Sequence, residues 1–407
     1  MAVAALTVQN GPMSDKAITL TFLLIACAAG MCLWFMTAAI LPDLVAELGL
    51  STSRQSALSS AVQAGFVVGA LGIAISGLAD RVDPRWLFTL AAFGSAATNA
   101  LLLVVDLGGN TAVALRFLTG MLMAGVYPVG MKIAVGWGTT DRGLLVGALV
   151  GALTFGKSIP YGLAWLGGAD WRSTIAIASA VAALGAGLAL FTKLGPEHRK
   201  APGFQPAAMW LAVTDRNIRS AYLGYLGHMW ELYVFWAWIG LAATASYTLA
   251  GTSDPVGLGK LTAFLAIGAG APICVWAGRR ADRFGKAEVA RAAMIASGVL
   301  AVATAISFGG PPAITMALII LWGMAVIPDS AQFSALVADH APAEWAGSLL
   351  TLQTALGFLL TIITVELAPW VADTFGWPAL LAVLALGPAF GAWTIGPLLR
   401  RNQASAR

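Results

Sequence analysis

The sequence has few of the residues that a water-soluble protein places on its surface. Only 10% of its 407 residues are charged, whereas 59% are hydrophobic. An ordinary soluble domain carries about 25% charged residues, and a soluble fold of this length cannot hide so much apolar surface. The composition therefore excludes a soluble enzyme, a nucleic-acid-binding domain and a disordered scaffold. It indicates a chain that uses the lipid bilayer as its solvent.

Cysteine and histidine are scarce as well, with three residues of each. Cys27, Cys32 and Cys274 all lie in apolar runs, and their odd number gives neither a disulfide framework nor a zinc spacing. His228 and Glu231 are two potential ligands on one helix, which is a weak metal signal. No nucleophile has a plausible base nearby in the sequence. We therefore predict no metal, no cofactor and no enzymatic activity.

Long apolar runs dominate the sequence, each near the length of about 20 residues that a helix needs to cross a bilayer. They form two sets of six around a polar stretch, and the first run is too long for a signal peptide. The pattern predicts an all-α membrane protein with an N-terminal six-helix bundle (1–192), a cytoplasmic central loop (193–217) and a C-terminal six-helix bundle (218–407). The expected spans are 18–41, 57–78, 86–105, 111–134, 143–165, 171–192, 219–243, 258–277, 288–307, 312–335, 346–367 and 376–398.

The basic residues predict the orientation of these helices, because cytoplasmic loops of membrane proteins are enriched in Lys and Arg. The loops on the side of the termini hold seventeen such residues, against three on the other side, namely Arg54, Arg172 and Lys260. Both termini are therefore expected to face the cytoplasm, in a multi-pass protein of the plasma (inner) membrane. The seventeen are Lys16, Arg81, Arg85, Arg142, Lys193, Arg199, Lys200, Arg216, Arg219, Arg279, Arg280, Arg283, Lys286, Arg291, Arg400, Arg401 and Arg407.

The two halves share a loop motif. Asp80-Arg81 follows the second expected span and Asp282-Arg283 follows the eighth, 202 residues later. The second copy, within 278–286, fits the pattern G-x-x-x-D-R-x-G-R/K, which is typical of the major facilitator superfamily of secondary transporters. The first copy departs from it, because other residues replace its two glycines. Together with the six-plus-six helices, the chain resembles this superfamily over essentially its whole length.

This resemblance implies a fold of two pseudo-symmetric halves that transports a small solute by alternating access. It also implies that the loop residues Asp80, Arg81, Asp282 and Arg283 act as a latch that holds one conformation closed. The alternative is that these residues form ordinary turns with topology-setting charges. Arg116 begins an R-x-x-x-G element on the fourth span that is also similar to the family and is linked there to proton coupling or to structure.

Ionisable residues inside expected spans are costly and mark functional candidates. Arg116 and Lys157 lie at similar depth on sequence-adjacent helices, where two cations repel unless an anion or a carboxylate lies between them. Arg116 is expected either to pair with Asp106 or to support a substrate site. Lys157 is expected either to face a central cavity or to form a structural pair. Lys132, Asp329 and Glu366 are expected near helix ends, within reach of the interface.

The seventh span carries an acid–base pair. His228 and Glu231 are three residues apart, hence on one helix face, about halfway through the membrane. A carboxylate withdrawn from water and a histidine can both take up and release protons near neutral pH, which suits a proton carrier. Tyr233 and Trp230 are expected to line an aromatic part of the site. Alternatively, Glu231 neutralises Lys157 across the two halves.

The leading hypothesis is proton-coupled symport of an anionic or polar metabolite, with Lys157 and Arg116 binding the solute and Glu231 and His228 carrying the proton. A proton is favoured over sodium. One alternative is proton-driven efflux of a drug-like or cationic compound, bound by Glu231 and Asp329. Another is a non-transporting receptor or scaffold. Residues 151–158 match the phosphate-loop pattern G-x-x-x-x-G-K-[ST], but they lie within an expected span, so we interpret the match as chance.

Overall fold

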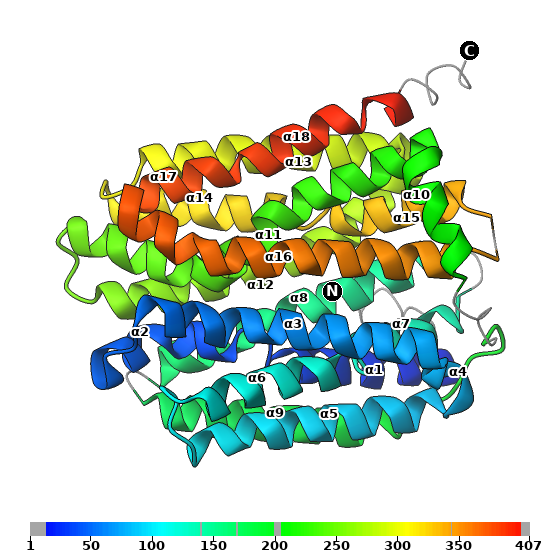
Figure 1. Ribbon diagram of the computed structural model, residues 1–407, viewed down its shortest axis with the longest axis horizontal. Coiled ribbons are helices and arrows are strands. Elements are labelled where there is room, and N and C mark those ends of the chain that lie inside the picture. Colours follow the sequence, from blue (N-terminus) through cyan, green and yellow to red (C-terminus); the bar gives the residue numbers. More distant parts are fainter. Residues whose placement is uncertain (1–13, 139–140, 168–169, 199–204, 343, 400–407) are drawn as a thin grey trace.

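The computed structural model describes residues 14–138, 141–167, 170–198, 205–342 and 344–399, and every regular element in these ranges is helical. Twelve of the described helical segments are long and apolar enough to cross a membrane. They run roughly parallel to the long axis of the molecule (Figure 1). The predicted all-α membrane protein with twelve spans is confirmed.

The elements follow one another as six spans, a connection and six more spans. The first six spans contain α1 (Asp15–Met31), α2 (Met36–Leu48), α3 (Thr52–Ser76), α5 (Pro84–Ala100), η2 (Leu101–Leu103), α6 (Asn110–Met123), α7 (Tyr127–Val135), α8 (Arg142–Leu166) and α9 (Trp171–Ala189). The short helices α4 (Leu78–Arg81), η3 (Pro206–Trp210) and α10 (Leu211–Thr214) lie in loops. The last six contain α11 (Arg216–Leu249), α12 (Pro255–Phe284), α13 (Lys286–Ile306), α14 (Pro312–Ala325), α15 (Ser330–His340), α16 (Ala346–Phe375), α17 (Trp377–Leu384) and α18 (Leu386–Thr394).

The chain forms two helical bundles that lie against each other, blue to green below and green to red above in Figure 1. The junction between them consists mainly of α3 against α16 and of α8 against α12. We call the end of the molecule where α1 begins and α18 ends the termini side, and the opposite end the far side. That the termini side is cytoplasmic stays a prediction, as do the bundle boundaries at 192 and 218.

Polar caps start several of these helices at the predicted edges of the apolar runs. The Ser14 and Ser51 hydroxyls accept hydrogen bonds from the backbone N–H groups of Ala17 and Arg54. Asp215 caps α11 in the same way, through two N–H groups at 2.9 Å. Such caps satisfy donors that a helix leaves free at its first turn. The observed spans therefore agree with the predicted ones within a few residues at most ends, and several extend further into the loops.

Four spans are interrupted near their middle, which the apolar pattern did not predict. The first breaks at 32–35 between α1 and α2, the fourth at 124–126 between α6 and α7, the tenth at 326–329 between α14 and α15, and the twelfth at 385 between α17 and α18. The breaks in the fourth and tenth spans occupy corresponding places in the two halves, as do the repeated loops. Broken helices free backbone carbonyls inside the bundle, which must then find donors there.

Part of the sequence-based prediction falls on residues that the structure does not describe. Arg199, Lys200, Arg400, Arg401 and Arg407, which contribute to the predicted orientation, lie outside the described residues. The same holds for 1–13 and 400–407 of the two predicted bundles and for 199–204 of the predicted central loop.

Candidate functional site

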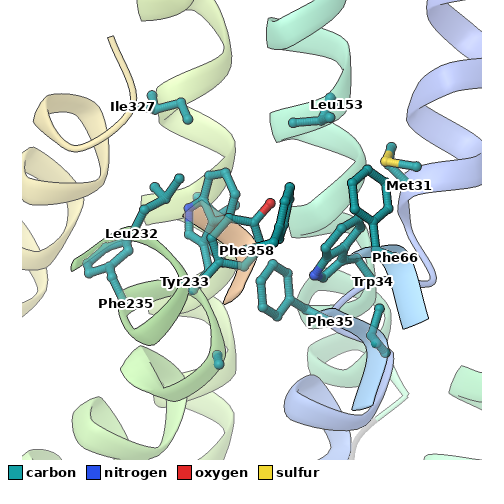
Figure 2. Packing of buried hydrophobic residues seen from close by; sticks show 14 of the residues in the cluster. Met31, Trp34, Phe35, Phe66, Leu153, Leu232, Tyr233, Phe235, Ile327 and Phe358 are labelled. Atoms are coloured by element: carbon teal, nitrogen blue, oxygen red, sulfur yellow. The ribbon is translucent and has the colours of Figure 1, made fainter. Parts of the chain in front are cut away.

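A layer of aromatic rings fills the middle of the junction between the two halves (Figure 2). Trp34 and Phe35 come from the break in the first span and Phe66 from α3, whereas Tyr233 and Phe358 come from α11 and α16. Ring centroids lie 4.7 Å apart for Phe66 and Phe358, 5.5 Å for Trp34 and Phe358, and 5.7 Å for Trp34 and Tyr233. Rings of one half therefore pack directly on rings of the other.

Lys157 of α8 places its ammonium group inside this layer. The side chain is buried, and its Nζ lies 4.5 Å from the ring centroid of Trp34, 4.3 Å from that of Trp236 and 4.7 Å from that of Tyr233. Aromatic faces attract cations in this geometry. Nζ donates one hydrogen bond, 2.7 Å long, to the Tyr233 hydroxyl. Among the described residues no carboxylate pairs with it, so the alternative pairing of Lys157 with Glu231 is wrong in this conformation.

The polar atoms in this layer are mostly hydrogen-bond donors. A lysine ammonium has three N–H groups, and Lys157 uses one of them on Tyr233. The Trp34 indole nitrogen, which can only donate, is buried and has no hydrogen-bond partner within the described chain. Buried polar groups normally find partners, so this surplus of donors indicates a place for an acceptor that the protein itself does not supply.

Arg116 is buried at a different place and in a different way. Its guanidinium donates to the carbonyls of Leu33 at 3.0 Å and Trp34 at 2.7 Å, both at the break in the first span, and to Asn99 Oδ1 at 3.2 Å. The predicted pairing with Asp106 is wrong, because Asp106 is exposed and caps its own loop through the Gly108 N–H. Arg116 thus holds the backbone that presents Trp34, instead of lying in the ring layer.

Glu231 points into the C-terminal half. Its Oε1 accepts hydrogen bonds from the Ser297 hydroxyl at 2.8 Å and from the Trp322 indole N–H at 2.6 Å, and the side chain is buried. These partners lie on α13 and α14. Glu231 is therefore only two residues from Tyr233, the partner of Lys157, yet it is held by helices of its own half.

His228 meets an acid that the sequence placed elsewhere. Its Nδ1 lies 2.9 Å from Asp329 Oδ1, and both residues are buried. The expectation that Asp329 lies near the end of its span is wrong. The tenth span continues to His340, and Asp329 occupies the break between α14 and α15 within it. His228, Glu231 and Asp329 thus form a buried polar cluster inside the C-terminal half.

Trp230 lies apart from the ring layer. Its indole N–H donates to the Val383 carbonyl on α17 at 3.2 Å, which places it between helices of the C-terminal half. The tryptophan of the same span whose ring reaches Lys157 is Trp236. The sequence-based search missed Trp34, Phe66 and Phe358. One signal was available for the first of them, because Trp34 and Trp236 are 202 residues apart, the spacing of the repeated loops.

The far side of the junction is held by polar contacts between the halves. Lys260 of α12 and Asp43 of α2 form a buried ion pair, with Nζ 3.0 and 2.7 Å from the two carboxylate oxygens. Glu366 of α16 accepts hydrogen bonds from Ser56 and Ser60 of α3 at 3.2 and 2.6 Å. This conformation therefore has its two halves joined on the far side of the ring layer.

The repeated loops lie on the termini side. Asp80 forms an ion pair with Lys132 of α7, at 2.5 Å, within the N-terminal half. Lys132 also donates to the Ala79 carbonyl, so its ammonium group is bound to the loop that follows the second span. Asp282 of α12 lies next to the start of α8 in the other half. A Cβ atom added to Gly143 there would be 3.7 Å from both carboxylate oxygens of Asp282. Arg81 and Arg283 are exposed.

The phosphate-loop match at 151–158 lies inside the continuous helix α8, so it forms no loop that could bind phosphate.

Comparison with known proteins bears on the whole chain. Over 392 residues it is 29% identical to the chloramphenicol resistance protein of Streptomyces lividans, covering 89% of this chain and 85% of that protein.

Solved structures share the fold at low sequence identity. A variant of the nucleoside transporter NupG superposes with a TM-score of 0.70 at 15% identity, covering 93% of this chain and 98% of that one. The proton:xylose symporter XylE, bound to 6-bromo-6-deoxy-D-glucose, gives a TM-score of 0.66 at 15% identity, covering 92% and 94%. The family model of the Major Facilitator Superfamily matches residues 22–365. With its two six-helix halves and its repeated Asp-Arg loops, the chain belongs to the Major Facilitator Superfamily of solute transporters.

Proposed function

We propose that this transporter carries a small anionic solute together with a proton across the plasma membrane, by alternating access of a site at the ring layer. The observation that carries the proposal is Lys157, a buried lysine between the two halves whose neighbours are rings and one phenol. An ammonium is costly to bury without a counter-ion. A solute anion would supply that counter-ion, and the solute would be released when the site faces water.

The proton would travel through the cluster in the C-terminal half. Glu231 and His228 keep the role proposed from the sequence, and Asp329 joins them because it lies against His228. Two carboxylates and an imidazole in a dry environment are groups that exchange protons when water reaches them. α11 carries both Glu231 and Tyr233, so one helix links the proton groups to the partner of Lys157.

The conformational change would replace contacts on one side by contacts on the other. Opening the far side requires the ion pair between Asp43 and Lys260 to part, together with the hydrogen bonds of Glu366. Asp80, Arg81, Asp282 and Arg283 would act as the latch that holds the termini side closed in the alternate state, and Asp282 lies next to the start of α8 of the other half already in this conformation. Arg116 would support the site by holding the break that presents Trp34.

The test uses the purified full chain in liposomes with a trapped pH dye. The probes are inorganic anions and sulfonates, which stay ionised and do not cross the bilayer as neutral acids. Symport predicts acidification of the lumen when a transported anion is added. Glu231→Gln should abolish the acidification, and protein-free liposomes give the background. Wild-type acidification in both Lys157→Met and Glu231→Gln would contradict the proposal.

A second candidate is proton-driven efflux of a drug-like compound, favoured by the likeness to the Streptomyces lividans resistance protein. In that case Glu231 and Asp329 would bind the compound and Lys157 would be structural. Quaternary ammonium probes in the same liposomes distinguish the two. A response confined to these cations, with alkalinisation of the lumen, would favour efflux over anion symport.

A further inference from the structure

The ring layer has a second property besides its surplus of donors. It is made of rings from both halves that pack against each other in tilted arrangements, Trp34, Phe35 and Phe66 against Tyr233 and Phe358. When the halves part, each set loses its aromatic partners. Stacked and edge-on ring pairs contribute about 0.5–1.5 kcal/mol beyond their buried area. A flat aromatic solute between the separated halves would restore these contacts, whereas an aliphatic one would not.

The donors lie among the same rings. Within the described chain, the Trp34 indole N–H has no acceptor, and Lys157 has two N–H groups beyond the one that it gives to Tyr233. Hydroxyl-rich solutes need both donors and acceptors, which amide side chains supply together and carboxylates supply as acceptors. The polar groups that reach the ring layer from Lys157, Trp34 and Tyr233 are two nitrogen donors, the ammonium and the indole N–H, and one hydroxyl.

We propose that the solute is a planar aromatic monoanion, whose ring lies between the aromatic side chains of the two halves and whose anionic oxygens accept from Lys157 and Trp34. This inference rests on the proposed anion transport and narrows it to one class of compound. Trp34 is then a residue that determines specificity. Arg116 fixes its position by binding the Trp34 carbonyl.

Three matched probes separate ring from charge when their binding to the full chain in detergent is measured by titration calorimetry. Benzenesulfonate has both ring and charge, methanesulfonate has the charge alone, and benzenesulfonamide has a ring without the charge. We expect benzenesulfonate to bind at least about tenfold more tightly than either of the others, since each lacks contacts worth more than about 1.4 kcal/mol.

Trp34→Phe keeps a ring at this place and removes the N–H donor. It should weaken benzenesulfonate binding by about tenfold to about a hundredfold, the range expected for one hydrogen bond to an anion, and leave the weak binding of benzenesulfonamide unchanged. Trp210→Phe is the matched control, because Trp210 is 69% exposed in the connection between the halves. Elution of both variants as single species in size-exclusion chromatography shows that they fold.

Each contrary result identifies what has failed. Equal affinity for methanesulfonate and benzenesulfonate overturns the aromatic inference but leaves anion transport standing, and the liposome assay would then show acidification with both. Equal affinity for benzenesulfonamide and benzenesulfonate overturns the need for charge, and with it both proposals. Binding of none of the three overturns the inference, as does benzenesulfonate binding that Trp34→Phe leaves unchanged.

Discussion

Among the described residues, three lysine and arginine side chains are buried, and each has a different set of neighbours. Arg116 is surrounded by acceptors, two backbone carbonyls and the Asn99 amide oxygen. Lys260 has the carboxylate of Asp43. Lys157 has aromatic rings and one hydroxyl. In the proposed mechanism, the first cation is structural, although its buried Nε has no partner among the described residues, the second is paired while the far side is closed, and the third is completed by a ligand. The proposal thus assigns structural, gating and binding roles by the neighbours of each buried charge.

The largest expected effect follows from removing the first cation. Arg116→Met removes the side-chain hydrogen bonds to the carbonyls of Leu33 and Trp34 inside the bundle and should lower stability by about 3–5 kcal/mol, since each hydrogen bond to a charged group contributes about 1.5–3 kcal/mol. Thermal unfolding in detergent measures this loss. Arg116→Lys, which keeps the charge and one donor direction, should recover part of it. An unchanged melting temperature in Arg116→Met would remove the structural role.

Lys157→Met should have the opposite profile. Replacing a buried, incompletely partnered charge by an apolar side chain of similar length is often neutral or stabilising, so the melting temperature should stay at or above that of the wild type. Anion-driven acidification in liposomes should fall by about a hundredfold, which corresponds to the loss of a charged hydrogen bond of about 3 kcal/mol. Lys193→Met, at an exposed lysine, is the matched control. A large loss of stability would make Lys157 structural.

Lys260 is tested through its partner Asp43. Asp43→Asn weakens a contact that exists only while the far side is closed, so the population with an open far side should rise about tenfold, or about 1.4 kcal/mol. Electron resonance distances between spin labels at Thr111→Cys and Ala313→Cys, exposed far-side positions in opposite halves, measure that population. The three native cysteines are buried and should not take the label.

The matched control for this experiment is Asp373→Asn. Asp373 also joins the halves on the far side, through a 2.9 Å hydrogen bond from Thr52, but this contact is exposed. Exposed polar contacts contribute little, so the distance distribution should barely change. Equal shifts in both variants would show that burial of the Asp43–Lys260 pair has no special weight.

The smallest effect is expected for Arg85 and Asp83, a partly exposed ion pair. A hydrogen bond from the Arg85 guanidinium holds the pKa of the Asp83 carboxyl below its usual range, and Asp83 also caps α5 through the Arg85 N–H. Asp83→Ala should cost about 1 kcal/mol at pH 7. Because the folded pKa is depressed, this stability is present above the unfolded value of about 3.9 and disappears as the pH falls through the folded value. Melting curves at pH 7 and pH 3 check both statements.

The sequence predicted the fold well because apolar run length and charge pattern determine where helices cross a bilayer. It placed the ionisable groups less well, because depth was counted from the end of each run. The apolar run places Asp329 near the end of the tenth span, whereas α15, which contains several polar residues between Ser330 and His340, extends that span past it. Breaks such as the one at 32–35 leave no mark in an apolar run, so the carbonyls that bind Arg116 had no sequence signal.

The candidate site was predicted in part. Lys157 and Tyr233 were both named from the sequence, and the structure brings them to 2.7 Å. The remaining rings come from four spans, in both halves. Only tertiary packing decides which side chains of a uniformly apolar span face the junction. Trp230 and Trp236 lie on the same helix, and the sequence-based choice fell on the one that packs against α17.

The most direct test of the account compares Lys157→Met with the wild type in liposomes that contain a trapped pH dye, after both proteins have given the same melting temperature. Addition of a transported sulfonate should acidify the lumen of the wild-type liposomes and leave that of the variant at the background of protein-free liposomes. Acidification by the variant at the wild-type rate would contradict the claim that Lys157 binds the solute.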